Sequence, residues 1–497
     1  MALPDLIEIV PLDQPVRAEI TVPGSKSITN RALILAALAD GDVTLKGALW
    51  SEDTQIMVAC LKELGFVVHV APDPDEPCNR TILVMGQGGV VPPGGTVSEP
   101  VELFVGNAGT AARFLVPFLC LGSGVYRLHG TPRMHERPQA ALFDAVRELG
   151  YNVEAENEND RLPARIFSGD VVRTPESQTE FIVRKSLPAP SKTCGVSIAE
   201  SSQFASALLL SATVGGWQVN LVGQNEDESP YVAMTSKLIE VFPKKGGVFQ
   251  IEPDASSGSY FWGANWLVAV TLFMKDFLEE TPYEKIAARF NEVWNWVNAS
   301  RPGSKPAATA GEGTQVSVRN WPVSGWQIDA DFPMFIPLPD QVSREGQLGD
   351  SIMTAIVLAA HVWGGLGPER REKGIRFTEL GRLRVQECDR VTALRTELSK
   401  CGARVVEAGD TLTCYQTKLH GAEIETYNDH RMAMCFAILG LRVPGLRIKN
   451  PACVKKTFPN FFQKLAVAPP HGLGAEIWEV KNGQRSRKLT GADLFAD

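Results

Sequence analysis

Six stretches of the sequence repeat one pattern, in which a polar or glycine-rich cluster leads into an apolar helical run, a glycine, a short strand and a second helix. They begin near residues 25, 107, 201, 254, 350 and 429. Self-similarity of this kind is typical of an architecture assembled from one supersecondary unit. The sequence therefore predicts an internally repeated α/β protein.

The residues that open these stretches suit helix N-termini. Each opening carries a Ser, Asn or Asp, and such side chains satisfy N–H groups that an α-helix leaves unpaired. A helix N-terminus also carries partial positive charge. If the units pack around pseudo-symmetry axes, several of these ends face one place, which is then an anion-binding site.

Composition narrows the class of protein. The 497 residues are 44% hydrophobic and 21% charged, as in globular proteins, and a chain of this length favours two domains. The formal net charge of −8 argues against nucleic acid or an anionic membrane as the main partner. Any anion binding must therefore be local.

The cysteines and the N-terminal segment indicate a compartment. Nine cysteines are scattered without metal-ligand spacing. The N-terminus lacks a basic start followed by an apolar run, and no stretch reaches the roughly eighteen apolar residues of a membrane-spanning helix. We expect a reduced cytoplasmic protein without a structural metal, and no motif predicts a nucleotide, metal or organic cofactor.

Two segments depart from the repeat. In the fourth stretch the chain beyond Trp266 runs into a Pro/Gly/Ala-rich segment at 301–315, which is typical of a flexible loop. The residues from Ala466 onward match none of the six stretches. Both segments are interpreted as elaborations.

The first stretch opens with PGSKSITNR at 23–31. Lys26, Ser27 and Arg31 stand where an extended segment meets a helix, so charge and polar donors lie beside a glycine that lets a ligand approach. A turn followed by a solvated helix start is the alternative. Walker A spacing is absent, which excludes a P-loop.

The next motifs again combine glycine with arginine. GNAGTAAR at 106–113 enters an apolar helix with small residues against which a ligand can lie. In PRMHERP at 132–138, Arg133 and Arg137 are four residues apart on one expected helix face, and no acid is expected between them on that face. Two such cations repel each other, so we expect them to hold an anion.

Polar groups recur at two later helix starts. SSQF at 201–204 caps an apolar helix; its second serine is either spare or bonds a phosphate oxygen. ESPY at 228–231 brings Tyr231 near the start of another helix.

The C-terminal half supplies further cations. NDHRMAM at 428–434 joins an Asn/Asp cap to His430 and Arg431, a titratable group and a fork-shaped donor. VKKTFP contributes Lys455 and Lys456 before a Thr-Phe-Pro break.

The stretch LGRLRVQECDRV at 380–391 interleaves charges with an apolar stripe. On a helical wheel Glu387 lies in line with Val391, Leu394 and Leu398. A carboxylate on a buried stripe is costly unless it is paired, and Arg390 is an available partner. Glu387 is thus either half of a structural ion pair or a group for general acid–base work.

Seven motifs in this order resemble the 5-enolpyruvylshikimate-3-phosphate (EPSP) synthase family: PGSKSITNR, GNAGTAAR, PRMHERP, SSQ, LRVQECDR, YNDHRMAM and KKTFP. The resemblance runs from about residue 15 to 465 and is poor from about 264 to 345. The family joins shikimate 3-phosphate to phosphoenolpyruvate and releases phosphate, on the shikimate route to aromatic compounds. The related UDP-N-acetylglucosamine enolpyruvyl transferases have a cysteine-bearing glycine-rich loop that is absent around 115–130.

The resemblance implies a fold and a place for the site. It implies a two-domain inverse α/β barrel of six βαβαββ units, with the active site in the interdomain cleft. The domains are expected at 25–250, and at 1–24 plus 251–497, with an insertion at about 264–345 and a C-terminal extension at 466–497. It also implies a monomer that acts on small molecules, without nucleic acid or membrane.

The resemblance further implies roles for individual residues. Phosphoenolpyruvate is expected to contact Lys26, Gly109, Thr110, Arg133, Gln203, Arg390, Arg431 and Lys456. Shikimate 3-phosphate is expected to contact Ser27, Arg31, Ser201, Ser202, Tyr231, Asp350, Arg382 and Gln386, with Asn107 and His430 as further candidates. Asp350 is expected to be the base for the acceptor hydroxyl, while Glu387 and Lys26 move protons at C3 of phosphoenolpyruvate. Asp350 is preferred to Asp340 because GDSIMT matches the family's Asp-x-x-Met-Thr.

Several positions depart from the family pattern. Where the family has an Asn and a Lys that contact the shikimate carboxylate, this chain has Arg382 and Gln386, so amide and cation have exchanged places. An Arg is not equivalent to a Lys, so the geometry of this contact shifts. Glu228 replaces a serine near the substrate phosphate, and Phe114 replaces a frequent proline.

These departures leave three functions open. The first is an active EPSP synthase. The second is a relative that acts on another phosphorylated or carboxylated cyclic alcohol, and the third is a non-catalytic binding relative. The presence of the anion-binding residues and all three acid–base candidates favours the first.

Overall fold

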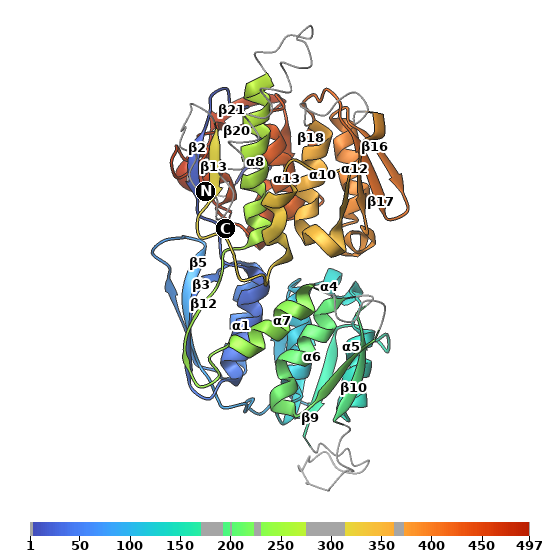
Figure 1. Ribbon diagram of the computed structural model, residues 1–497. Coiled ribbons are helices and arrows are strands. Elements are labelled where there is room, and N and C mark those ends of the chain that lie inside the picture. Colours follow the sequence, from blue (N-terminus) through green and yellow to red (C-terminus); the bar gives the residue numbers. More distant parts are fainter. Residues whose placement is uncertain are drawn as a thin grey trace. The chain divides into compact units, whose positions relative to one another are not determined.

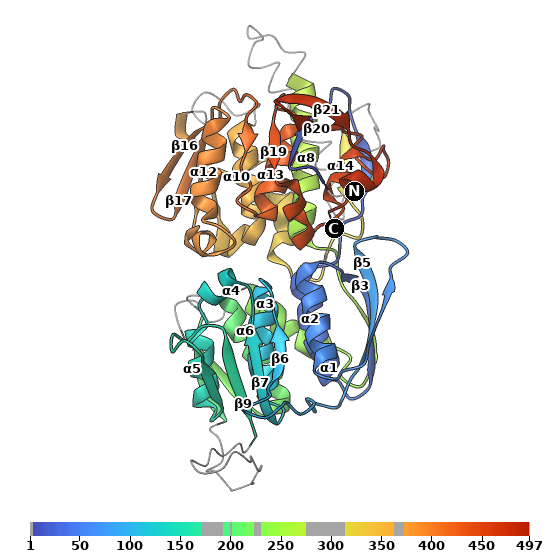
Figure 2. The same cartoon turned by 180° about the vertical axis from the view of Figure 1, so that it is seen from behind.

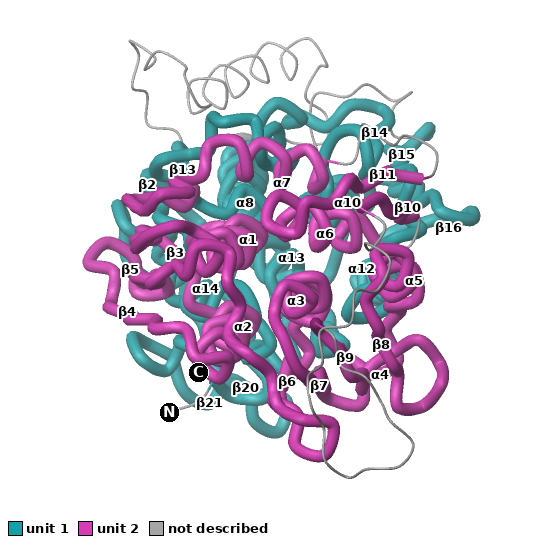
Figure 3. Tube along the Cα trace, turned by 90° about the horizontal axis from the view of Figure 1, so that it is seen from below, with its two compact units in different colours: residues 1–23, 253–497 teal, residues 24–252 magenta. Residues whose placement is uncertain are grey.

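The structure, a computed structural model, describes residues 3–169, 192–198, 201–222, 230–274, 314–361 and 372–496. The chain divides into two compact units, coloured separately in Figure 3: residues 24–252, and residues 1–23 with 253–497. Both chain ends therefore belong to the discontinuous unit. Glu228, Ser229 and the segment 301–313 lie outside the described residues.

The unit of residues 24–252 combines helices with mixed sheets. Its strands are β3 (Asp42–Leu49), β4 (Val68–Pro72), β5 (Asn79–Met85), β6 (Val101–Phe104), β7 (Gly124–His129), β8 (Asn152–Ala155), β9 (Ala164–Ser168), β10 (Thr193–Ser197), β11 (Gln218–Val222) and β12 (Gly247–Gln250). Its helices are α1 (Lys26–Leu38), α2 (Glu52–Glu63), α3 (Gly109–Leu119), α4 (Pro132–Glu136), α5 (Ala140–Glu148), α6 (Ser202–Gly215) and α7 (Pro230–Val241). Figure 2 shows α1 and α2 beside the β3–β5 sheet.

The discontinuous unit has the same ingredients. Its strands are β1 (Leu6–Ile9), β2 (Arg17–Ile20), β13 (Gln315–Val318), β14 (Gln341–Ser343), β15 (Ile375–Thr378), β16 (Arg404–Ala408), β17 (Thr411–Tyr415), β18 (Glu423–Ile424), β19 (Arg447–Lys449), β20 (Ile477–Lys481) and β21 (Gln484–Lys488). Its α-helices are α8 (Ala255–Met274), α10 (Ile352–His361), α12 (Arg390–Lys400), α13 (His430–Gly440) and α14 (Phe461–Ala466). Its short helical turns are η1 (Ile328–Phe335), η2 (Arg344–Leu348), η3 (Gly349–Ser351), η4 (Gly381–Val385), η5 (Pro451–Lys456) and η6 (Gly491–Leu494).

The three four-stranded sheets of the described residues share one topology. Their strand orders are β12-β3-β5-β4, β6-β7-β9-β8 and β14-β15-β17-β16, and in each the first pair is parallel and the later pairs are antiparallel. One helix precedes the second strand of each sheet and another follows it, as in α1-β3-α2, α3-β7-α5 and α10-β15-α12. The predicted α/β class is confirmed.

Apolar helices form the core of the discontinuous unit. Figure 1 shows α8, α13, α10 and α12 side by side. Every residue from Ile352 to Ala360 of α10 is buried, as expected for a helix that is hydrophobic on all faces. Such packing holds the helix N-termini in fixed positions. Among the described helices, none is long and apolar enough to cross a membrane.

The C-terminal extension has a place in this unit. Its strands β20 and β21 extend a five-stranded sheet of order β18-β19-β1-β20-β21. The buried Glu8 on β1 accepts hydrogen bonds from Arg447 on the adjacent β19 and from Arg485 on β21, two strands away. The extension therefore covers an edge that β1 would otherwise leave unpaired.

Candidate functional site

In the unit of residues 24–252, Arg31 joins helices α1, α6 and α7. Its guanidinium donates to Thr235 Oγ1 at 2.7 Å and to Ser206 Oγ at 3.0 Å, and it also donates to the backbone oxygens of Ser27 and Tyr231. All of these acceptors are neutral. Burial lowers the pKa of Arg31 to about 10, because desolvation disfavours the charged form.

The start of α6 carries the predicted SSQ motif. Ser201 is the N-cap and its side chain accepts from Gln203 N at 3.3 Å, so the predicted cap is confirmed. Arg113 on α3 donates to Gln203 Oε1 at 2.7 Å. This bond turns the carbonyl oxygen of Gln203 toward Arg113 and leaves its amide N–H groups for other acceptors. Ser202 is buried beside the cap.

The GNAGTAAR motif forms the entry to α3, where Gly109 lies next to Arg137. A Cβ at residue 109 would lie 2.7 Å from Arg137 Nη1. Arg137 Nη1 donates to Asn107 O at 3.4 Å. Asn107 Oδ1 has no hydrogen-bond partner among the described residues, and Thr110 is buried. The glycine is thus needed for a close approach of Arg137 to the helix start.

The prediction that Arg133 and Arg137 lie unopposed on one helix face is wrong. Arg133 Nη1 lies 2.6 Å from Glu136 Oε2, with both side chains about half exposed. α4 ends at Glu136, so Arg137 is not on its face. The sequence interpretation overlooked an acid three residues along the same helix, where such pairs form readily. Elsewhere in this unit, Lys26 Nζ pairs with Asp53 Oδ2 at 3.2 Å.

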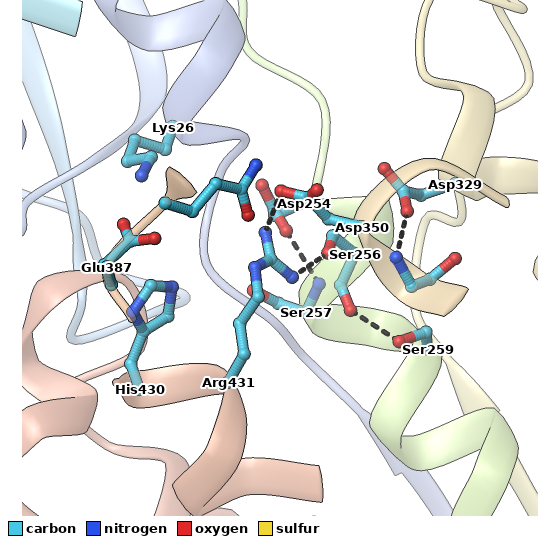
Figure 4. Close-up of polar contacts among 12 residues, drawn as sticks. Lys26, Asp254, Ser256, Ser257, Ser259, Asp329, Asp350, Glu387, His430 and Arg431 are labelled. Atoms are coloured by element: carbon cyan, nitrogen blue, oxygen red, sulfur yellow. Dashed lines mark hydrogen bonds and ion pairs between the residues drawn. The ribbon is translucent and has the colours of Figure 1, made fainter. Parts of the chain in front are cut away.

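In the discontinuous unit, Asp350 lies between two arginines. Its Oδ2 is 3.2 Å from Arg431 Nη2, and its Oδ1 is 3.1 Å from Arg344 Nη2. Figure 4 shows Arg431 also reaching Ser256 at the start of α8. Burial raises the pKa of Asp350, but Arg431 and Arg344 outweigh it and hold the pKa well below its usual range. Asp350 is therefore an ionised carboxylate at neutral pH.

A second carboxylate, Asp329, lies behind the turn that carries Asp350. It accepts from Ser351 N at 2.6 Å (Figure 4). Gly349 has a φ of 51°, and a Cβ there would lie 3.1 Å from Asp329 Oδ2. Burial and the Asp350 charge raise the pKa of Asp329 to about 7.

Glu387 is held by two cations. Its carboxylate lies 2.8 Å from Arg390 Nη2 and 3.0 Å from Lys456 Nζ. Arg390 is buried and also pairs with Asp429 Oδ2 at 2.7 Å. Three predicted site residues therefore meet at this carboxylate.

The helical placement of Glu387 is wrong. Asp389 accepts from Thr392 N and caps α12, so the helix begins at Arg390, and Glu387 precedes it. The apolar stripe of α12 is buried without Glu387, at Val391, Leu394 and Leu398. The carboxylate is half-buried because of its ion pairs.

The remaining predicted residues lie around this cluster. The Gln386 amide oxygen accepts from Arg390 Nη1, and Arg382 lies on η4 and is half-buried. Asp429 caps α13 by accepting from Arg431 N at 2.8 Å, as the NDHRMAM motif predicts. His430 is buried, with Nδ1 3.7 Å from Asp429 Oδ1. No group of three or more His, Cys, Asp or Glu within the described ranges is arranged to hold a metal ion.

Sequence reasoning missed several residues that organise these clusters, among them Ser206 and Thr235, which accept from Arg31. Arg113, Ser256, Asp329 and Arg344 each contact a predicted site residue or its backbone neighbour. Arg113 closes the GNAGTAAR motif and Ser256 stands in the fourth helix start, so both were open to prediction. Asp329 and Arg344 lie in the segment without a recognisable motif, and the sequence around them gives no signal.

The comparisons with solved structures identify the fold. An EPSP synthase from Acinetobacter baumannii gives a TM-score of 0.60 at 19% identity, covering 95% of this chain and 100% of the other. The enolpyruvyl transferase NikO from Streptomyces tendae gives 0.55 at 14% identity, covering 99% and 100%. The fold is therefore that of the enolpyruvyl transferases.

The sequence comparisons identify the family. The family model described as EPSP synthase (3-phosphoshikimate 1-carboxyvinyltransferase) matches residues 11–281 and 347–465. A relative from Opitutus terrae is 34% identical over 496 residues, covering 94% of this chain and 98% of its own length. A relative from Nostoc sp. is 32% identical over 484 residues, covering 93% and 98%. Both are named 3-phosphoshikimate 1-carboxyvinyltransferase, and this chain belongs to the EPSP synthase family.

Proposed function

We propose that the chain transfers the enolpyruvyl group of phosphoenolpyruvate to the 5-hydroxyl of shikimate 3-phosphate and releases phosphate. Family membership supports this reaction. The observation that carries the proposal is the state of the two acid–base candidates. Asp350 and Glu387 are each held by two cations in the discontinuous unit, as an acid–base pair fixed in position requires.

The proposed reaction proceeds by addition and elimination. The oxygen of the 5-hydroxyl bonds to C2 of phosphoenolpyruvate, and Asp350 accepts the proton that this hydroxyl loses. At the same time C3 gains a proton and becomes a methyl group. Glu387 and Lys26 are assigned to the proton at C3. The tetrahedral intermediate then loses a C3 proton and its C2–O bond to phosphate, which restores the C2–C3 double bond.

The cations and polar groups divide between the two substrates. We assign phosphoenolpyruvate to Lys26, Gly109, Thr110, Arg133, Gln203, Arg390, Arg431 and Lys456. We assign shikimate 3-phosphate to Ser27, Arg31, Ser201, Ser202, Tyr231, Asp350, Arg382 and Gln386. Asn107 and His430 are further candidates for contacts with the substrates. Arg31 supports the second assignment, since it is buried on neutral acceptors and an anion is the partner it lacks among the described residues.

The six-unit barrel also stays a proposal. Its support is the shared topology of three sheets and the six helices that start where the repeats begin. A monomer is expected from the family resemblance, and a cytoplasmic location from the scattered cysteines and the N-terminal segment. Sedimentation of the purified full chain would test the monomer.

The test is phosphate release from phosphoenolpyruvate with shikimate 3-phosphate as the acceptor. We expect turnover with this acceptor and little with unphosphorylated shikimate, which lacks the anion for Arg31. Turnover only with another cyclic alcohol would favour a relative with a different acceptor. Binding without turnover would favour a non-catalytic relative, and either result would overturn the proposal.

A further inference from the structure

Arg344 stands outside the part of the chain that the family model matches. The matched ranges end at 281 and resume at 347, so the match excludes Arg344. Its side chain nevertheless contacts Asp350, with Nη2 3.1 Å from Oδ1. A residue from a segment that the family model does not match therefore touches the proposed base.

The turn that carries Arg344 is fixed by its own hydrogen bonds. η2 is a single π-helical turn, a rare conformation that is frequent at functional sites. Ser343 caps the turn by accepting from Gly346 N at 3.0 Å, and Ser343 N donates to Gln347 Oε1 at 2.7 Å. The backbone at Arg344 is thus held from both sides.

The burial of Arg344 shows that the contact is more than a surface ion pair. Only 5% of the residue is exposed, and its Nε has no hydrogen-bond partner among the described residues. Burying a guanidinium is costly unless a carboxylate offsets its charge. Asp350 is that carboxylate, so each group depends on the other.

The two arginines hold different oxygens of Asp350. Arg431 contacts Oδ2 and Arg344 contacts Oδ1. A carboxylate held at both oxygens cannot rotate freely, and each oxygen still has a lone pair for another donor. The direction of the remaining lone pairs is therefore fixed before a substrate arrives.

We propose that Arg344 is a positioning residue for Asp350, which fixes the orientation of this carboxylate for the acceptor hydroxyl. The inference rests on the proposed function, since it concerns the same site. It assigns a role in catalysis to a segment that the family model does not match.

The charges around Asp350 predict a pH signature. Arg344 from η2, Arg431 from α13 and Arg390 from α12 favour the ionised carboxylate, while burial and Asp329 from η1 oppose it. Removing Arg344 therefore raises the pKa of Asp350. A base must be ionised to act, so the acidic limb of the kcat–pH profile moves to higher pH.

The test compares Arg344→Met and Arg344→Lys in the full chain. We expect R344M to lower kcat roughly 100-fold at pH 7, the scale of a misplaced catalytic group, and to leave KM for phosphoenolpyruvate within about threefold. Its acidic limb should move up by about one pH unit or more. In R344K the acidic limb should lie closer to its wild-type pH, because the positive charge is kept. Its kcat should stay below that of the wild type, since Lys cannot reproduce the two-pronged donor geometry of Arg.

Arg395→Met is the matched control. Arg395 is a half-exposed arginine of the same unit, 3.2 Å from Glu407, and its loss should leave kcat and the profile unchanged. An R344M enzyme with the kcat and pH profile of the wild type would overturn the inference.

A second readout does not depend on activity. Melting temperatures of R344M, Asp350→Asn and the double variant form a thermodynamic cycle, and coupled residues give a non-additive result. Additive shifts would overturn the inference even if the wild type turns over no substrate. An inactive wild type with non-additive shifts would instead contradict the proposed function and retain the Arg344–Asp350 coupling.

Discussion

Arg31 in one unit and the arginine pair Arg390 and Arg431 in the other are stabilised in opposite ways. In the unit of residues 24–252, Arg31 is buried on hydroxyl and carbonyl oxygens. In the discontinuous unit, the buried Arg390 and the mostly buried Arg431 pair with the carboxylates of Asp429, Glu387 and Asp350. Neutral acceptors leave the positive charge of a cation uncompensated, so it can attract an anionic ligand. A carboxylate partner already neutralises much of that charge. The first arrangement suits the binding of an anion, whereas the second also fixes the carboxylates that acid–base chemistry needs.

The largest effect is expected from Asp350→Asn, which removes the base and leaves Arg344 and Arg431 without its compensating charge. We expect kcat to fall by roughly 10²–10⁴, the usual contribution of general base catalysis. Steady-state kinetics at pH 7 check this. A kcat within tenfold of the wild type would show that the carboxylate cluster is structural and would break the comparison.

Arg31→Met tests the arginine that is buried on neutral acceptors. We expect KM for shikimate 3-phosphate to rise about 100-fold, since a charge-assisted contact is lost, while the melting temperature stays level or rises because a costly buried charge is removed. Kinetics and calorimetry of the same preparation check both parts. A large fall in melting temperature with an unchanged KM would assign Arg31 to the fold instead.

Asp329→Asn sharpens the comparison through pH. The folded pKa of Asp329 is about 7, above the roughly 3.9 of an unfolded chain. Stability from this group is therefore present below about pH 4 and is lost as the pH rises through about 7. The variant has no carboxyl group to titrate here. Its free energy of unfolding, relative to that of the wild type, should therefore rise by on the order of 2 kcal/mol between pH 5 and pH 8. A difference in melting temperature that is constant over this range would contradict the expectation.

The smallest effect is expected from Phe114→Leu. The Arg31 guanidinium lies 5.1 Å from the centroid of the Phe114 ring, and a cation–π contact contributes about 0.5–2 kcal/mol. We expect KM for shikimate 3-phosphate to rise about threefold. Phe118→Leu, on the same helix and fully buried, is the control for lost packing and should leave KM unchanged. An equal rise in both variants would point to packing.

Local signals in the sequence predicted the helix starts well. The openings near 25, 107, 201, 254, 350 and 429 become helices that begin at Lys26, Gly109, Ser202, Ala255, Ile352 and His430. Caps act within one turn, so a short motif contains the information. The caps at Ser201 and Asp429 are confirmed for this reason.

Longer-range contacts were beyond such reasoning. The wheel that placed Glu387 on α12 failed because the Asp389 cap starts the helix three residues later. The contacts of Arg344 with Asp350 and of Asp329 with Ser351 depend on how turns without a motif pack. No spacing in the sequence encodes them, so only the folded chain reveals these partners.

Calorimetric titration of shikimate 3-phosphate into the full-length Arg31→Met and Asp350→Asn variants tests the division of roles most directly. The comparison predicts that R31M loses about 100-fold in affinity, whereas D350N binds within about tenfold of the wild type although its turnover is lost. Weak binding by D350N together with near-normal binding by R31M would contradict the account.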